Sequence, residues 1–596
     1  MATRKATTAL GALVAFSLSA ALSGCAPSPE VIEGSSVVVG VTQPFTSYNV
    51  HSGQGLENTT NAALIDVTSS TFFSYDAQGT LQPHPEWGSA RVVSDDPFRV
   101  EYALGSDARW SDGVEVDATD LLLAWAANSG ALNDDGVERD EVIDPESGAP
   151  RAGADPSLVF FDGDGARGLA HAAELPEVGG EGRSITVTFD SLVADWRLIG
   201  DVGLPAHRVG EKEGSGEDPA ETKSRVHQSI ITNDRAELAE LAHTWNAAYS
   251  WDEHAGPTRE LVGNGPYSVT AVVPGESTVL TANPHYRGAR KPTIETVTLR
   301  YFDDDAAIVD ALSDGTVDVA GELTNPEALA LLRNEPGLTV EAAPSAAWER
   351  LDVRVHHSRS GALEDPQARE AFLLSVPRDA IMADLVHPLA PETAPRHSFL
   401  FASGTDGDDA ARASGFAETD PERARAILAE LGGGQREVCI LFDATNTQRQ
   451  REFELIRDAA NSVGFTVTDC STPEWRELLA LDGAYDVALY SVREANFSAA
   501  SVQAMYASGS QMYRTIQLSD PEVDAAIERL SHQIGTPEEH ETRAAIDASL
   551  WAHRIGLPLF DHPQVVAYAA RVTVPPAPFF APSPVANCWS WVLGDP

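Results

Sequence analysis

The sequence is most informative at Gly263-Asn-Gly-Pro-Tyr-Ser-Val-Thr-Ala-Val-Val273, which is followed by Pro274-Gly-Glu276 and then by Ser277-Thr-Val-Leu-Thr-Ala282. Apolar residues alternate on both sides of the Pro-Gly pair, a pattern that predicts a β-hairpin. Asn283-Pro284 ends the hairpin, because the residue before a proline is driven out of the helical region. The stretch therefore predicts two antiparallel strands.

A strand, a helix and another strand are expected next. The β-branched residues of 294–302 favour a strand. Three aspartates at 303–305 suit the positive end of a helix from about 306 to 312. Residues 317–320 begin a further strand, so the region alternates strand and helix as α/β proteins do.

Three signals in this region resemble motifs of the bacterial extracellular solute-binding proteins of family 5, the peptide and nickel class. That family opens its hairpin with G-T-G-P-Y, closes it with N-P-x-Y and follows its helix with L-x-x-G-x-x-D. The corresponding residues here are 263–267, 283–286 and 312–318. Further matches follow in the family's order, the sharpest at 108–120 and others at 204–209, 520–527 and 555–560, and they extend the resemblance over essentially everything after residue 36.

The resemblance implies an α/β protein with the type II periplasmic-binding-protein fold of the large peptide-binding class. In this fold two lobes with mixed sheets close on a ligand about a hinge, and the first lobe carries an extra subdomain. The implied divisions are a lipoprotein signal peptide (1–24), a tether (25–36), a first lobe (37–300) including the subdomain (about 60–182), a second lobe (301–556) and a return to the first lobe (557–596). A chain of 596 residues is in any case too long for one core.

Two regions of the first lobe carry specific expectations. Trp110 is expected to be a buried structural residue rather than a ligand contact, and Asp120 to cap the helix that follows it. Residues 133–182 are rich in Gly, Asp and Glu and are expected to form a flexible acidic surface insertion. An EF-hand fails there, because placing Gly165 at the sixth position puts Phe160 at the first.

Composition limits the function classes. The formal net charge of −48 would repel phosphate backbones, so nucleic-acid binding is not expected. The sequence has no GxSxG elbow, no HExxH and no Cys/His motif. We therefore expect no enzyme, no resident metal and no cofactor.

The N-terminus has the pattern of a signal peptide. Arg4 and Lys5 precede an uncharged apolar run, Ala9 to Leu22, that is short for a membrane span. The run ends in Leu22-Ser-Gly-Cys25, which resembles a bacterial lipobox. The resemblance implies that Cys25 is lipidated and anchors the protein to the outer face of the cytoplasmic membrane. The alternative is an ordinary secretory signal with an incidental cysteine.

Two other cysteines lie in a predicted βαβ unit. Cys439 is in one apolar strand and Cys470 ends the next, with a helix of about 449–463 between them. Outside the cell a Cys439–Cys470 disulfide is geometrically allowed, and two buried thiols are the alternative. Cys588 is left over, with no role that the sequence indicates.

In the first lobe, a loop after the first strand is expected at the edge of the ligand cleft. It supplies five candidate ligand-binding residues: Phe45, Ser47, Tyr48, Asn49 and His51. An aromatic loop with hydroxyls and amides suits the orientation of a polar ligand in an apolar pocket. A loop packed for structural reasons is the alternative for each residue.

In the second lobe, peptide-binding family members use a segment D-x-x-x-x-G-W-x-A-D-Y, whose second aspartate pairs with the ammonium group of the peptide. Alignment from Asp486 puts Ala495 at that aspartate, which is a departure from the family. The candidates in the matching segment are Tyr490, Arg493, Glu494 and Asn496. Glu494 could replace the charge, Arg493 could bind a carboxylate, or the two could form a local surface ion pair.

The function implied is a lipid-anchored, monomeric receptor that captures an oligopeptide-like solute by hinge closure and delivers it to an ABC permease in the membrane. Because the ammonium-binding aspartate is missing, other solutes remain alternatives: a nickel complex, haem, an oligosaccharide or an opine-like compound. A lipoprotein that senses a ligand, rather than transporting it, is a further alternative.

Overall fold

The computed structural model describes residues 30–594 except 57, 77–80, 145–147, 164–167, 213, 252–255, 322, 324–325, 415–417, 494–497, 511–512, 535, 576–579 and 581–582. The expected signal peptide and Cys25 lie outside these residues. Within them, no helix combines the length and the apolar character that a membrane span needs.

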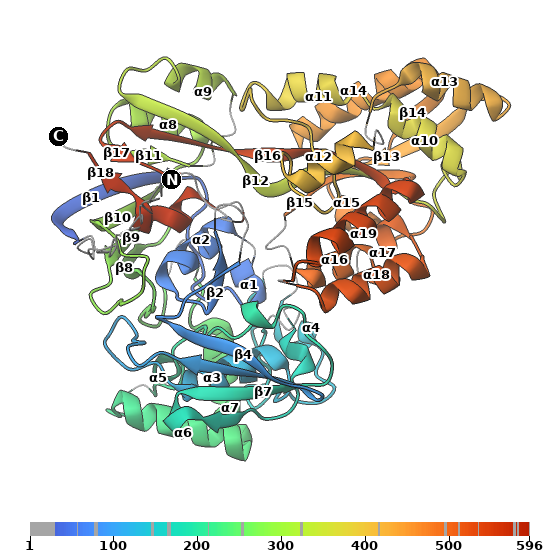
Figure 1. The fold of residues 1–596 in the computed structure, drawn as a ribbon. Coiled ribbons are helices and arrows are strands. Elements are labelled where there is room, and N and C mark those ends of the chain that lie inside the picture. The colour runs from blue at the N-terminus through green and yellow to red at the C-terminus, as the bar shows by residue number, and fades with distance from the viewer. Residues whose placement is uncertain are drawn as a thin grey trace, which may run out of the picture.

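One sheet runs through the molecule (Figure 1). Its strands are β1 Ile32–Val41, β8 Tyr267–Val273, β9 Ser277–Ala282, β10 Ile294–Tyr301, β11 Val319–Ala320, β12 Leu338–Val353, β13 Arg436–Leu441, β14 Phe465–Asp469, β15 Val487–Arg493 and β16 Gly556–Ala569. They lie in the order β14-β13-β15-β12-β16-β11-β1-β10-β9-β8. The long strands β12 and β16 pair antiparallel from Leu338 opposite Ala569 to Asp352 opposite Gly556, and their register shifts between Pro344 and Trp348. These two strands connect the halves of the sheet.

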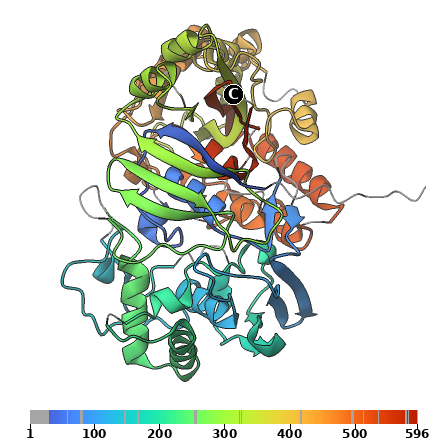
Figure 2. The same ribbon diagram turned by 90° about the vertical axis from the view of Figure 1, so that its left-hand side faces the viewer.

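The hairpin expected from the sequence is confirmed. β8 and β9 pair antiparallel, β9 pairs with β10, and β10 lies parallel to β1. Figure 2 shows these green strands beside the blue β1. The helix that follows β10 is α8 Asp305–Ser313, and of the three expected aspartates it is Asp304 that caps it.

The Gly-Asn-Gly motif has a packing reason. The amides of Asn264 and Gly265 both donate to the carbonyl of Thr68, the last residue of α2 Thr59–Thr68, at 2.9 and 2.8 Å. A Cβ on Gly265 would lie 2.4 Å from the amide nitrogen of Ser69. Only glycine therefore allows the hairpin to dock this closely on the end of α2.

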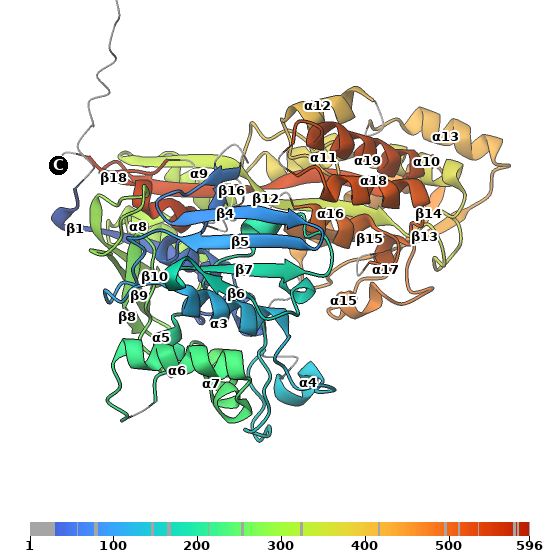
Figure 3. The same cartoon turned by 60° about the horizontal axis from the view of Figure 1, so that its bottom comes forward.

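A second sheet belongs to the first lobe. Its strands β4 Gly88–Asp95, β5 Phe98–Leu104, β6 Glu177–Gly179 and β7 Ser184–Phe189 lie in the order β4-β5-β7-β6. Figure 3 shows α3 Ala118–Ser129, α5 Ala206–Val209, α6 Pro219–Thr232 and α7 Arg235–Ala247 to one side of it. β7 and three of these helices follow residue 182, the end expected for the subdomain.

Asp117 caps α3, so the expectation for Asp120 was wrong. Asp117 Oδ1 accepts from the amide of Thr119 at 2.8 Å, and Asp120 Oδ2 accepts from the amide of Asp117 at 3.0 Å. The two residues form a capping box, in which Asp120 is the third helical residue. Trp110 is 1% exposed, as expected of a structural tryptophan.

Asp162 is one of the residues that anchor the acidic insertion. Asp162 is 7% exposed and accepts two hydrogen bonds from the guanidinium of Arg139, at 2.7 and 3.0 Å, and one from the amide of Gly53 at 3.0 Å. Arg139 begins α4 Arg139–Val142. This part of the insertion is thus tied to the loop after β1; Gly165 lies outside the described residues.

The second half of the molecule contains the expected βαβ unit. β13 and β14 are parallel neighbours on either side of α14 Thr447–Val463. Cys439 and Cys470 form a disulfide in the structure, which is one of the two alternatives left open by the sequence, and Cys588 is buried. The larger helices here are α10 Pro366–Ser375, α12 Asp406–Ala413, α13 Pro421–Glu430, α16 Ala499–Tyr506, α18 Pro521–Ser531 and α19 Glu539–His553.

The remaining elements are short: α1 Gly53–Leu56, β2 Phe73–Tyr75, β3 Leu81–Pro83, α9 Pro326–Leu332, α11 Arg378–Ile381, α15 Trp475–Leu478, α17 Tyr513–Ile516, β17 Val572–Thr573 and β18 Val592–Leu593.

Apolar side chains form separate cores on the two sides of the β12–β16 crossing. The first core is formed by side chains of β1, β10 and the second sheet, among them Val39 and Val100. The second core is formed by side chains of β12, β13 and the helices of the other half, among them Leu351 and Ile546. Ile308 of α8 packs in a third cluster beside β11 and β16. Residues 305–332, assigned to the second lobe from the sequence, thus lie next to first-lobe strands, and the division of the chain stays a prediction.

Candidate ligand-binding site

The loop after β1 is packed against the body of the first lobe. Four of its five candidates are at most 3% exposed: Phe45, Ser47, Tyr48 and Asn49. The amides of Thr46 and Ser47 donate to Asn61 Oδ1 of α2 at 2.9 and 3.2 Å, and Asn49 Nδ2 donates to the carbonyl of Trp245 at 2.9 Å. These polar groups are used within the fold, and a part for them in ligand binding stays a prediction.

His51 differs from its neighbours in the loop because it is half-buried rather than buried. Its ring lies nearly parallel to that of Trp245, with centroids 6.4 Å apart and an interplanar angle of 29°. Trp245 itself is fully buried in α7. His51 is therefore the candidate in this loop that retains a surface that a solute could contact.

Tyr490 lies inside the second lobe. It is 3% exposed, and its hydroxyl donates to Asp352 Oδ2 on the neighbouring strand β12 at 2.5 Å. Asp352 also accepts from Arg350 Nε at 2.8 Å. Burial raises the pKa of the Asp352 carboxyl, although Arg350 and Tyr490 act to lower it. The geometry assigns Tyr490 to this internal network.

The other second-lobe candidates follow Tyr490 on the chain. Arg493 is exposed and is the last residue of β15, opposite Ala347. Glu494 and Asn496 lie outside the described residues. Ser47 and Asn49 are bonded to α2 and α7, whereas Tyr490 is bonded to β12, so these buried candidates of the two lobes have different partners.

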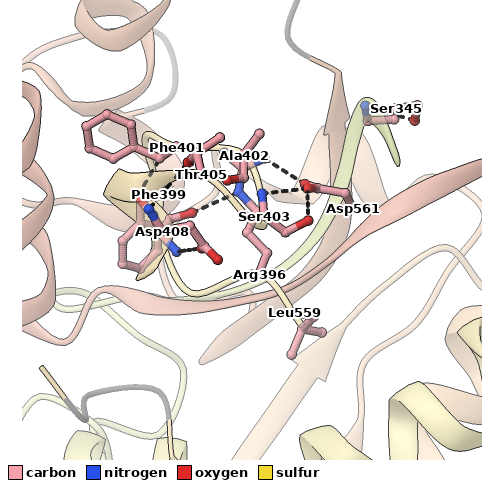
Figure 4. A network of polar contacts seen from close by, with 12 residues as sticks. Ser345, Arg396, Phe399, Phe401, Ala402, Ser403, Thr405, Asp408, Leu559 and Asp561 are labelled. Atoms are coloured by element: carbon pink, nitrogen blue, oxygen red, sulfur yellow. Dashed lines mark hydrogen bonds and ion pairs between the residues drawn. The ribbon is translucent and has the colours of Figure 1, made fainter. Parts of the chain in front are cut away.

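A polar network that the sequence did not suggest fixes the segment 396–408 to β16 (Figure 4). Arg396 Nη1 lies 2.8 Å from Asp561 Oδ1, and both side chains are almost completely buried. Asp561 Oδ2 accepts from the amide of Ser403 at 2.9 Å and from its hydroxyl at 2.5 Å. Asp408 accepts from the amides of His397 and Ser398 at 2.6 and 3.0 Å.

Trp348 connects this network to the Arg350 pair. The guanidinium carbons of Arg396 and Arg350 lie 4.1 and 4.7 Å from the centre of its ring. Each guanidinium also has a buried carboxylate, Asp561 and Asp352 respectively. Two paired cations on one indole make this part of the sheet polar yet rigid. In the sequence, the signal for this network is that Trp348, Arg350 and Asp352 occupy alternate positions of one strand and therefore share a face.

The opposite face of β12 carries a second charged cluster. Glu349 accepts from Arg449 Nε at 2.9 Å and lies 3.0 Å from His562 Nε2. Burial acts to raise the pKa of Glu349, but His562 and Arg449 hold it below its usual range. Burial and the Glu349 charge raise the pKa of the neighbouring Glu452 well above its usual range. Both side chains are fully buried, so in this structure neither is exposed to a solute.

Among the residues that the structure describes, no group of three or more His, Cys, Asp or Glu side chains could hold a metal ion.

One hollow, with a volume of about 640 Å³, lies between the insertion and α7 and is lined by residues such as Val142, Phe160 and Asn246. It belongs to the first lobe alone, not to the space between the lobes.

Comparison with known proteins identifies the family. The model of the bacterial extracellular solute-binding proteins, family 5 (middle region), matches residues 82–514. The chain belongs to this family. It is 26% identical to an uncharacterized lipoprotein of Mycobacterium tuberculosis over 89% of this chain and 88% of that protein. It is 24% identical to the oligopeptide-binding protein OppA of the same organism over 90% of this chain and 81% of OppA.

Among solved structures, the chain is similar to the periplasmic EDTA-binding protein EppA. The TM-score is 0.72 at 20% sequence identity, and the match covers 95% of this chain and 98% of EppA. This likeness confirms the α/β, type II periplasmic-binding-protein fold expected from the sequence. The family 5 solute-binding protein described here is thus related to receptors for peptides and other small solutes.

Proposed function

We propose that this family 5 protein is a lipid-anchored, extracytoplasmic receptor that captures oligopeptide-like solutes for an ABC importer. The observation that carries the proposal is the relationship to OppA, which extends over 90% of the chain. Membrane anchoring is supported by the Leu22-Ser-Gly-Cys25 sequence and by a relative named as a lipoprotein. The acidic surface agrees with a small-molecule ligand and argues against nucleic acid.

Hinge closure is supported by how the halves are joined. β12 and β16 cross between the two cores side by side, and their pairing becomes irregular between Pro344 and Trp348, at the transition from one core to the other. A two-strand connection with a local irregularity can bend while each core remains intact. Closure would then bury the solute between the lobes, and affinity would depend on how much the solute favours the closed state.

A different solute is the second candidate, and one observation favours it. Ala495 stands where peptide-binding members have the aspartate that pairs with the peptide ammonium group. EppA, which has the same fold, is named for binding EDTA, a compound with no peptide bond. A metal chelate, haem, an oligosaccharide or an opine-like compound therefore remains the alternative, as does sensing rather than transport. In each case the protein binds its solute without turning it over.

The test is a thermal-shift titration with short peptides, each in a free and an N-acetylated form, alongside a nickel–histidine chelate and an opine. A ligand that binds the folded state alone raises Tm with its concentration. We expect peptides to raise Tm, and N-acetylation to have little effect because Ala495 offers no carboxylate. A shift with chelates or opines and none with peptides would overturn the peptide assignment.

A further inference from the structure

Asp195 of the first lobe reaches the second lobe. It lies between β7 and α5, in the segment that includes the 3-10 helix Trp196–Leu198. Its Oδ1 accepts from the amide of Ala499 at 3.3 Å, and its Oδ2 accepts from the amide of Ala500 at 3.1 Å. These are the first two residues of α16, more than 300 positions later in the chain.

The Asp195 carboxylate caps α16 rather than the 3-10 helix that follows Asp195 in the chain. Asp195 precedes its own 3-10 helix, but its side chain makes no capping hydrogen bond there. The side chain is instead 7% exposed, against the start of α16. Ser498 Oγ accepts from the amide of Ser501 at 3.0 Å. Ser498 and Asp195 together satisfy the first three amides of α16, which a helix leaves without internal partners.

The residues beside Asp195 pack into different lobes. Ala194 packs against the core of the second lobe. Trp196 packs against the core of the first lobe, with its ring 6.3 Å from that of Phe73 on β2. The segment therefore lies at the junction of the two lobes, away from the strands β12 and β16 that connect them.

The start of α16 favours the Asp195 carboxylate, whereas burial opposes its charge. The start of a helix carries a partial positive charge, which stabilises a carboxylate near it. Burial raises the pKa of the Asp195 carboxyl, whereas the amides of Ala500 and Ala499 and the charge of Arg543 on α19 act to lower it; Glu539 of α19 acts to raise it. Arg543 and Glu539 themselves form an ion pair at 2.9 Å.

We infer that Asp195 is a positioning residue for solute capture: its contact with the N-terminus of α16 stabilises the closed arrangement of the lobes and slows release of the solute. The inference rests on the hinge closure proposed above. When the lobes separate, the Asp195 carboxylate and the α16 amides return to water. A contact made only in the closed state raises affinity chiefly through a lower dissociation rate.

The experiment compares Asp195→Ala and Asp195→Asn with wild type and with Asp190→Asn as a matched control. Asp190 belongs to the same segment, but its carboxylate is exposed and is 2.9 Å from His171 Nδ1 within its own lobe. Hydrogen exchange of the protein that still carries its retained solute reports on the amides of Ala499 and Ala500 in the closed state. The release rate is measured for whatever solute the purified protein retains, so the assay does not require a peptide.

We expect Asp195→Ala to lose protection at Ala499 and Ala500 and to release solute about tenfold faster, since a charged hydrogen bond is lost from the closed state alone. Asp195→Asn, which keeps an acceptor, should fall between, and Asp190→Asn should match wild type. Unchanged exchange, or changed exchange with an unchanged release rate, would overturn the inference. If a non-peptide solute is released faster, the peptide assignment fails while the role of Asp195 stands.

Discussion

Arg350 and Asp352 form an ion pair inside the second lobe, two residues apart on β12. Arg350 Nε lies 2.8 Å from Asp352 Oδ1, and both side chains are at most 1% exposed. Tyr490 on β15 completes the pair by donating to the other carboxylate oxygen. Buried charges of this kind depend on every partner being present.

The first prediction concerns Arg350, Asp352 and Tyr490. Tyr490→Phe should lower the free energy of unfolding by about 1–3 kcal/mol, because Asp352 loses a buried donor. Arg350→Met should cost about 3–5 kcal/mol by leaving Asp352 without its cation. Urea denaturation measures both changes. The double variant Arg350→Met, Asp352→Leu should recover most of the loss; a double variant as unstable as Arg350→Met would contradict the account.

The second prediction concerns the pH dependence of stability. Burial raises the pKa of Asp547, on α19, to about 6. This pKa exceeds the value of about 3.9 in the unfolded chain. The contribution of Asp547 to the free energy of unfolding is therefore fully present below pH ~4 and is lost as the pH rises through about 6.

Asp547→Asn removes that titration while keeping an oxygen for the amide of Phe399, which Asp547 Oδ1 accepts at 2.7 Å. Relative to wild type, the variant should therefore gain stability as the pH rises from 4 to 7, by at most about 3 kcal/mol. Urea denaturation of both proteins across this range provides the measurement. A difference that does not change with pH would contradict the assignment.

The third prediction concerns the Cys439–Cys470 disulfide. It closes a loop across β13, α14 and β14, with a sequence separation of 31. The double change to serine should cost about 3–4 kcal/mol, because the unfolded chain is no longer constrained. Reductant should then lower the stability of wild type and leave that of the double variant unchanged. Equal stability of wild type with and without reductant would show that the bond is absent.

The fourth prediction concerns membrane attachment. Cys25→Ser should move the protein from the membrane fraction to the soluble fraction, because acyl chains supply the apolar surface that holds a lipoprotein in a bilayer. Cys588→Ala is the control, since Cys588 is buried within the fold and should not affect fractionation. Membrane retention of the Cys25→Ser variant would refute lipidation at this residue.

Local patterns predicted local structure well. The hairpin of β8 and β9, the helix α8 and the βαβ unit around α14 follow from alternation, turn residues and helix caps that lie within a few residues of each other. The error at α3 was also local: Asp117 and Asp120 are both suitable caps, and the helix begins at the earlier one.

The candidate site was less predictable because its contacts are nonlocal. The loop after β1 has the residue types of a binding loop, but Asn49 is bonded to Trp245, almost 200 residues away. Tyr490 likewise has its partner on β12. Asp195 could not be found from the sequence, since its partners are backbone amides, which every residue carries. Family resemblance predicted the architecture; the position of each side chain needed the three-dimensional structure.

Native mass spectrometry of the tagless mature protein, followed by denaturation and analysis of what is released, tests the central claim most directly. A receptor that closes on its solute releases it slowly and retains it through purification. The account predicts a series of short peptides of mixed sequence. Release of a single metal chelate, haem, sugar or opine-like compound would contradict it.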